Sequence, residues 1–168
     1  TGVYRVNAVK LASPALLATG SGTTGDGTQA TVGEITLSVP DGARLSPVLG
    51  RGISFASLVA SAKLSGTWPK PHITVEAVAD QLAVQDLRAR SGTFKAAADA
   101  TTFSEFENLN VDVETGSVSA GFRGKLDANS LTGDMRGSVA DLTQLGLQGG
   151  ALSIKGRVTA ERLSHAWD

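Results

Sequence analysis

The sequence predicts an all-β protein made of one continuous sheet system. Three observations support this fold class. Apolar and polar residues alternate along most of the chain, which is the side-chain period of a strand with one buried face. Apolar residues at helical spacing are rare, so the crossover helices of a parallel α/β fold are not expected. The 20 glycines and the few aromatic residues are typical of many short turns.

Five runs show the alternation most clearly, and we expect each of them to be a strand. They cover residues 34–39, 73–79, 110–114, 118–123 and 152–161. Each strand should have one apolar and one polar side, and the last run would span roughly 30 Å at ~3.3 Å per residue. The alanine-rich stretch 94–106 is compatible with either a short helix or a flat strand.

Connections are expected where glycine, proline and aspartate gather between these runs. Such turn signals occur at residues 20–27, 41–42, 69–71, 91–92, 115–116 and 149–150. Short helical turns are expected at residues 45–49 and 141–145, where Asp141 is a suitable N-cap.

A duplicated segment indicates a repetitive chain. Residues 50–69 read GRGISFASLVASAKLSGTWP, and residues 149–168 read GGALSIKGRVTAERLSHAWD. A gapless alignment pairs Gly50 with Gly149, Ser54 with Ser153, Val59 with Val158, Leu64 with Leu163, Ser65 with Ser164, and Trp68 with Trp167. We therefore expect residues 1–168 to be one continuous segment excised from a longer repetitive protein. Each copy should supply strands that extend one apolar surface.

Composition argues against several classes of protein. The 15 basic and 16 acidic residues nearly balance, whereas a nucleic-acid binder normally has a basic excess or stripe. The absence of cysteine excludes disulfides and thiolate metal sites. No apolar run approaches the ~20 residues of a membrane helix. The first residues do not have the shape of a signal peptide, so any targeting segment of the parent would lie outside this piece.

The motifs associated with chemistry are weak. Gly20, Gly22 and Gly25 have the spacing of a dinucleotide-binding loop, but a strand-like run follows them where a helix is required, so a hairpin loop is expected. His72 and His165 lack the further ligands of a zinc site and should be exposed polar residues.

The acidic residues of one region raise the question of acid–base chemistry. They are Glu105, Glu107, Asp112 and Glu114. A glycosidase needs two carboxylates across a cleft, and calcium needs a loop with regularly spaced acidic ligands. On an alternating strand these residues instead form a solvated stripe. We expect no enzymatic activity, no cofactor and no metal.

Three segments resemble recurring phrases of the TamB family of AsmA-like proteins. They are residues 64–75 (LSGTWPKPHITV), residues 82–90 (LAVQDLRAR) and residues 133–145 (GDMRGSVADLTQL). The resemblance covers most of the chain from Arg44 onward. It implies a β-taco, which is an elongated, curved and folded-over sheet with an open apolar groove. It also implies a periplasmic segment of a parent anchored in the inner membrane. The family is implicated in phospholipid movement between the two membranes and in outer-membrane protein assembly with the barrel partner TamA.

An alternating sheet needs something against its apolar face. Each exposed Val, Leu or Ile forgoes roughly 1.5–3 kcal/mol, which is large against a typical stability of ~5–15 kcal/mol. Phospholipid acyl chains are the expected cover. The candidate groove-lining residues are Ile73, Val75, Leu82, Val84, Val111, Val113, Val118, Phe122, Leu152, Ile154 and Val158.

Two alternatives remain open at this point. A structural β-solenoid or adhesin-like scaffold would enclose the same residues in a dry core. A lipocalin-like closed barrel is suggested by Gly66-Thr67-Trp68 and would carry a small ligand. An excised sheet should also associate end to end through its terminal strands, because unpaired strand edges template pairing.

Overall fold

The computed structural model describes residues 2–25, 30–45, 52–67, 70–84, 87–102, 105–145 and 147–161. Most of them lie in β-strands and few are helical, so the predicted all-β class is confirmed. The elements are β1 (Val3–Ala12), β2 (Leu17–Gly25), β3 (Val32–Val39), η1 (Gly42–Leu45), β4 (Ile53–Ser54), β5 (Ser57–Thr67), β6 (Lys70–Asp80), β7 (Ala83–Val84), β8 (Leu87–Arg88), β9 (Ser91–Ala100), β10 (Phe106–Thr115), β11 (Val118–Leu126), β12 (Ser130–Val139), η2 (Leu142–Leu145) and β13 (Leu152–Glu161).

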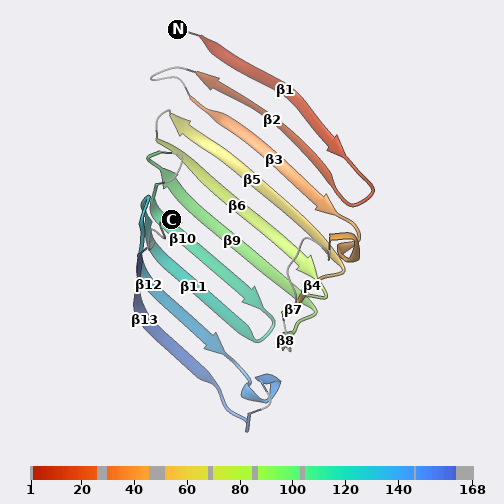
Figure 1. Cartoon of the computed structure of the whole chain (residues 1–168), viewed down its shortest axis with the longest axis vertical. Helices are drawn as coiled ribbons and strands as arrows, with labels where there is room; N and C mark the ends of the chain where they lie inside the picture. The colour runs from red at the N-terminus through yellow and green to blue at the C-terminus, as the bar shows by residue number, and fades with distance from the viewer. Residues whose placement is uncertain are drawn as a thin grey trace, which may run out of the picture.

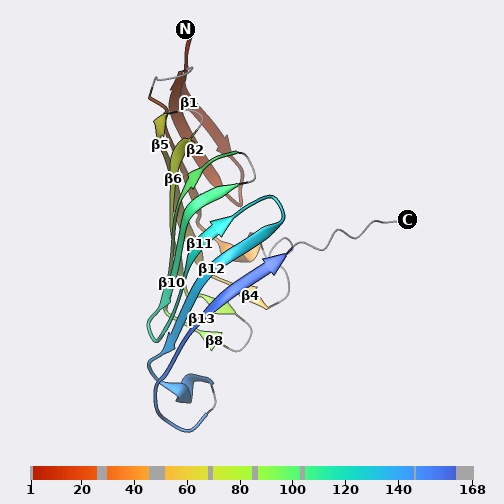
Figure 2. The same cartoon turned by 90° about the vertical axis from the view of Figure 1, so that its left-hand side faces the viewer.

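Ten of the described strands form one antiparallel sheet in the order β1-β2-β3-β5-β6-β9-β10-β11-β12-β13 (Figure 1). Most neighbouring strands of this sheet are consecutive in the chain, because short connections favour hairpins. The exceptions are β3 with β5, between which the chain forms β4, and β6 with β9, between which it forms β7 and β8. β1 and β13 lie at opposite ends and do not pair, so the sheet is not closed into a barrel. The lipocalin-like alternative is therefore wrong for the described chain. Figure 2 shows the sheet as a curved layer.

The pairing register separates the side chains into two faces. Residues directly opposite each other in an antiparallel pair lie on the same side of the sheet. Val113 is opposite Phe94 and Ala120, while the adjacent Asp112 is opposite Lys95 and Gly121. We call the side of Val113 the apolar face and the side of Asp112 the polar face. The alternation predicted for the five runs is confirmed, since one alternate set of residues in each run falls on the apolar face. Val78 belongs to the other set of residues 73–79 and lies on the polar face opposite Val59 and Thr93.

A second, three-stranded sheet of β4, β7 and β8 folds over one end of the large sheet, and we call it the end sheet (Figure 2). The backbone N–H of Gly42 donates to the carbonyl of Ala56 at 2.8 Å, which ties η1 to the segment between β4 and β5. A Cβ at Gly42 would lie 2.5 Å from Cδ2 of Phe55, so only glycine lets this ring pack there. Val39, on the apolar face at this end, is 1% exposed.

One region of the sheet differs from the sequence prediction, and another resolves an alternative that the sequence left open. Gly20, Gly22 and Gly25 belong to β2, so the predicted hairpin loop is wrong for these residues. Little space is left for a side chain at two of them: a Cβ at Gly20 would lie 3.3 Å from Cγ1 of Ile35, and one at Gly22 would lie 3.0 Å from the carbonyl oxygen of Val32. The stretch 94–100, left open between helix and strand, is part of β9.

The short helical turns are partly confirmed. η2 lies within the predicted residues 141–145, and Oδ1 of Asp141 accepts a hydrogen bond from the Thr143 N–H at 2.9 Å. The other turn begins earlier than predicted, at Gly42, and the predicted residues 46–49 lie outside the described residues. Residues 91–92 begin β9 and are not a turn, whereas residues 116–117 form the predicted tight turn between β10 and β11.

The two copies of the duplicated segment do not have equivalent roles in the described structure. The first copy spans β4 and β5, and the second spans β13. Val59 is opposite Ser38 and lies on the polar face, where it is 53% exposed. Its counterpart Val158 is opposite Gly133 and lies on the apolar face. The expectation that both copies extend one apolar surface in the same way is therefore wrong at these positions.

No helix among the described residues has the length and apolarity that crossing a membrane requires.

Candidate functional site

The apolar face of the large sheet brings together nine of the eleven residues that the sequence predicted to line a groove. Within each strand they are spaced by two residues, and across strands they occupy opposite or next-but-one positions. The nine are Ile73, Val75, Val111, Val113, Val118, Phe122, Leu152, Ile154 and Val158. The face is thus one surface that runs from β6 to β13.

The remaining two predicted residues, Leu82 and Val84, lie at the end sheet. Val84 is opposite Ile53 in the pairing of β4 with β7. Leu82 reaches back over the large sheet, because its Cδ2 lies 2.5 Å from the point where a Cβ at Gly92 would stand. These two residues therefore belong to the structure that closes one end of the apolar face.

Most of this face has no second layer above it. Ile154 is 52% exposed and Ile35 is 58% exposed, although both point to the side that a β-sandwich would cover. The buried hydrophobic residues of the described chain are Val39, Ala79, Ala98 and Ala100, and of these only Val39 is fully buried. The closed core expected of a solenoid scaffold is not present among the described residues.

Glycines shape the floor of the apolar face near β11 and β12. Gly124 and Gly133 are directly opposite each other. A Cβ at Gly124 would lie 2.8 Å from Cζ of Phe122, and one at Gly133 would lie 2.6 Å from the same atom. The ring of Phe122 therefore lies over the two glycines, an arrangement in which an aromatic side chain shields bare backbone. Phe122 makes this part of the face flat and apolar.

The sequence prediction missed an apolar hollow at the β1–β3 end of the same face. Its volume is about 360 Å³, and its apolar lining residues include Val6, Val9, Leu11, Ala18 and Ile35. Val6 and Val9 share a face although they are three residues apart, because the register shifts between them. A bulge of this kind breaks the period of two that strand prediction relies on. The alternation at residues 34–39 was the signal available for Ile35.

The polar face carries ion pairs and hydrogen bonds between neighbouring strands. Nδ1 of His72 lies 2.7 Å from Oδ1 of Asp99, and the side-chain amide of Asn108 donates to Oδ2 of the same carboxylate at 2.7 Å. The hydrogen bond from Asn108, and then that from His72, lowers the pKa of Asp99 below its ordinary 3.8. His72 is half-exposed, and His165 lies outside the described residues.

The acidic residues considered for acid–base chemistry do not converge on one point. Asp112 accepts a hydrogen bond from Arg136 at 2.6 Å, and Glu105 accepts one from the hydroxyl of Thr101 at 3.4 Å. Glu114 lies on the polar face opposite Ser119. In the part of the chain that the structure describes, no three histidine or acidic side chains are grouped to hold a metal ion.

No protein-family model, no curated protein and no solved structure matches this chain.

Proposed function

We propose that the apolar face holds phospholipid acyl chains, and that the chain is a segment of a TamB-like periplasmic bridge between the inner and outer membranes. The observation that carries the proposal is the uncovered apolar face between β1 and β13. Its side chains come from successive strands, so it has no polar gap across the sheet. Ile154, near one end, and Val9, near the other, are each more than half exposed.

Energetics favour a hydrocarbon occupant for such a surface. Each exposed Val, Leu or Ile forgoes roughly 1.5–3 kcal/mol relative to burial. An acyl chain of about sixteen carbons offers on the order of 10 kcal/mol gross at ~0.8 kcal/mol per buried CH₂. Contact with hydrocarbon needs no specific hydrogen bonds. A face lined by Val, Ile, Phe and Ala therefore suits lipids that differ in their headgroups.

The end sheet covers one part of the apolar face and leaves the rest open. Phe55 and Leu82 pack where Gly42 and Gly92 leave space. Val39, which lies in the same row across the sheet as Gly92, is buried. The β1–β3 end instead has an open hollow of about 360 Å³. In the proposal, acyl chains lie along the open part of the face, and the end sheet limits how far they extend.

The wider assignment depends on the resemblance of residues 64–75, 82–90 and 133–145 to TamB phrases. A parent of that kind is anchored in the inner membrane and works in the periplasm with a TamA-like outer-membrane barrel. In this proposal the apolar face is one section of a longer lipid path, and any role in outer-membrane protein assembly belongs to the parent.

Photo-crosslinking at adjacent residues of opposite faces tests the proposal. We would place benzoylphenylalanine at Ile154 or Val113 of the apolar face, and at the neighbouring Ser153 or Glu114 of the polar face. The chain would be expressed in the periplasm, irradiated and analysed for attached phospholipid by mass spectrometry. Adducts at Ile154 and Val113, with few at Ser153 and Glu114, are expected. Equal labelling of both faces, or none at all, would contradict the proposal.

A further inference from the structure

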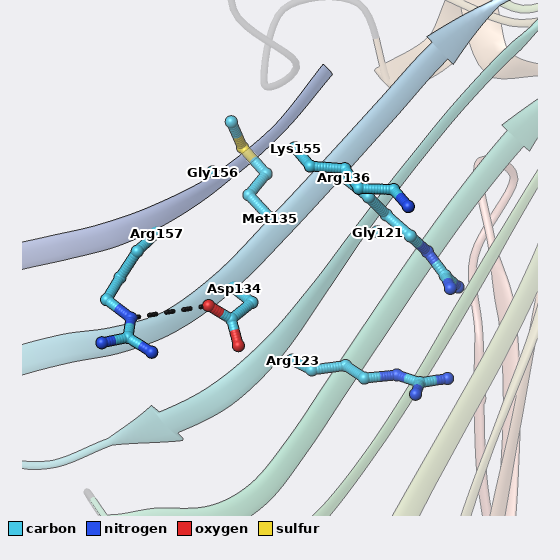
Figure 3. A pocket seen from close by; sticks show the side chains of 8 residues that line it. All are labelled: Gly121, Arg123, Asp134, Met135, Arg136, Lys155, Gly156 and Arg157. Carbon is cyan, nitrogen blue, oxygen red and sulfur yellow. Dashed lines mark ion pairs between the residues drawn. The ribbon is translucent and has the colours of Figure 1, made fainter. Parts of the chain in front are cut away.

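We infer that the polar face of β11, β12 and β13 carries a binding site for a phosphate group. The site lies on the side of the sheet opposite the proposed acyl-chain surface, so it does not depend on that proposal. It is a hollow of about 670 Å³ (Figure 3). The residues that line it are Gly121, Arg123, Asp134, Met135, Arg136, Lys155, Gly156 and Arg157.

The charged residues of this hollow form two parallel rows across three strands. One row is Gly121, Arg136 and Lys155, and the other is Arg123, Asp134 and Arg157. Neighbouring strands are ~4.8 Å apart, and rows two residues apart are separated by ~6.7 Å. Four cationic side chains and one carboxylate therefore share a small area of the sheet.

This arrangement differs from the pairing of the lysines elsewhere on the polar face, although the acidic Asp99 and Glu107 are also directly opposite each other. Lys63 is opposite Glu34, and Lys95 is opposite both Glu76 and Asp112. In the hollow, by contrast, Arg136 is directly opposite Lys155. Like charges directly opposite each other destabilise a sheet. A bound anion would relieve that repulsion.

The carboxylates nearby do not neutralise all four cations. Arg136 is drawn across Gly121 to Asp112, and Arg157 pairs with Asp134 at 3.6 Å. Arg123 donates to the neutral amide oxygen of Asn110 at 3.1 Å. Lys155 forms no ion pair with any described residue, and its charge remains available to a ligand.

A phosphate group fits these donors better than a single carboxylate does. Guanidinium groups present fixed pairs of N–H donors that match phosphate oxygens, and lysine adds a point charge. The side chains of Arg123 and Lys155 extend toward the same side of the hollow, whereas Arg157 pairs with Asp134 on the other side (Figure 3), so a phosphate would draw on Arg123 and Lys155. Gly121 carries no side chain on this face, and the side chain of Arg136 occupies the space above it, where a Cβ would lie 2.6 Å from Nε.

Two sources of phosphate are distinguished by two binding measurements on the 168-residue chain. One measures co-sedimentation with phosphatidylcholine vesicles that contain or lack phosphatidylglycerol. The other titrates inorganic phosphate and follows the backbone amide shifts of residues 121–125 and 153–157. The test variant is R123Q/K155Q. The control is K63Q/K95Q, which removes the same charge from the same face outside the hollow.

A lipid headgroup as ligand predicts binding to the phosphatidylglycerol vesicles alone. The affinity of R123Q/K155Q should fall about thirtyfold, since each Lys or Arg near an anionic membrane contributes about fivefold. A soluble phosphate predicts saturable amide shifts that R123Q/K155Q abolishes, without vesicle binding. Either result supports the site. The inference is overturned if neither probe binds, or if K63Q/K95Q weakens binding as much as R123Q/K155Q does.

Discussion

Arg136 reaches across β11 to Asp112, and its Nη2 donates to Oδ1 at 2.6 Å. The two residues belong to β12 and β10, and the position between them in the row is Gly121. A Cβ at Gly121 would lie 2.6 Å from Nε of Arg136 and 2.7 Å from the Asp112 oxygen. The missing side chain of Gly121 therefore allows an ion pair between strands that are not neighbours.

Replacing Gly121 with alanine should displace this ion pair and change stability little. The atoms in the way belong to side chains that can move, and exposed ion pairs contribute about 0–1 kcal/mol. Alanine is also favoured over glycine inside a strand by about 0.5–1 kcal/mol. We expect the free energy of unfolding to change by less than about 1 kcal/mol in urea denaturation. The Nε resonance of Arg136 should shift.

Replacing Gly124 with alanine should be much more damaging. The added Cβ would meet the carbonyl oxygen of Thr132, the Cα of Gly133 at 2.7 Å and the Phe122 ring at 2.8 Å. The first two are backbone atoms of the next strand, which cannot retreat without breaking the ladder. Overpacking typically costs about 1–3 kcal/mol, and we expect a loss in the free energy of unfolding of at least that size.

The matched control for Gly124→Ala is Gly156→Ala. Gly156 also lies on the apolar face within a strand, but a Cβ there would meet no atom within 4 Å. Its replacement should leave stability unchanged or raise it by about 0.5–1 kcal/mol. If both variants lose the same free energy of unfolding in denaturant titrations, the close approach of the neighbouring strand at Gly124 does not explain the loss.

The pKa of Asp99 should depend on the side chain of Asn108. Asn108 has a φ of 50°, so Asn108→Gly removes the amide while keeping a backbone conformation that glycine adopts easily. Because the hydrogen bond from Asn108 is the first cause of the lowered pKa, that pKa should rise toward 3.8 in the variant. Carboxyl ¹³C chemical shifts measured against pH would show the change.

The same linkage predicts a pH dependence of stability. A carboxyl whose pKa is lowered by folding stabilises the folded state above its unfolded pKa of about 3.8, and the effect is lost as pH falls through the folded pKa. Asn108→Gly and the unsubstituted chain should differ in their free energy of unfolding at neutral pH partly because of this charge. That part of the difference should shrink as the pH is lowered. A difference that stays constant from neutral pH to below that range would contradict the linkage.

Association through the outer strands is a further expectation. In the described sheet β1 and β13 are each paired on one side only. Unpaired strand edges template pairing with another chain. Sedimentation should show an apparent mass that rises with concentration, and amide hydrogen exchange in β1 and β13 should slow with it. A concentration-independent monomer would contradict this, and slowing confined to interior strands would point to face-to-face contact instead.

The sequence predicted regular strands better than irregular ones. In β11, in β13 and over residues 109–113 of β10, every second residue is apolar or glycine, and the pleat places those residues on one face, so Val113, Phe122 and Ile154 share the face that the alternation predicted. β1 was missed as part of the surface because the register shift between Val6 and Val9 moves the period by one residue. β2 was taken as a loop because its glycines carry no side chains to show a pattern.

The duplicated segment shows the limit of similarity between short stretches of sequence. Val59 and Val158 match in the alignment, yet they lie on opposite faces of the sheet. Strand β5 is preceded by the separate strand β4, whereas β13 runs without interruption through the equivalent residues. A difference of one residue in register reverses the facing of a whole strand, and alignment of side-chain types does not detect it.

The sequence by itself determined that the chain is all-β and which side chains within a strand share a face, because the period of two is a local property of extended backbone. The tertiary structure decided the order of the strands, the openness of the sheet and the contacts between residues far apart in the chain. The pair formed by Asp112 and Arg136, the Phe122 ring over Gly133 and the end sheet over Gly92 all depend on pairing register. Register is set by long-range contacts and turn geometry, which no single stretch of sequence contains.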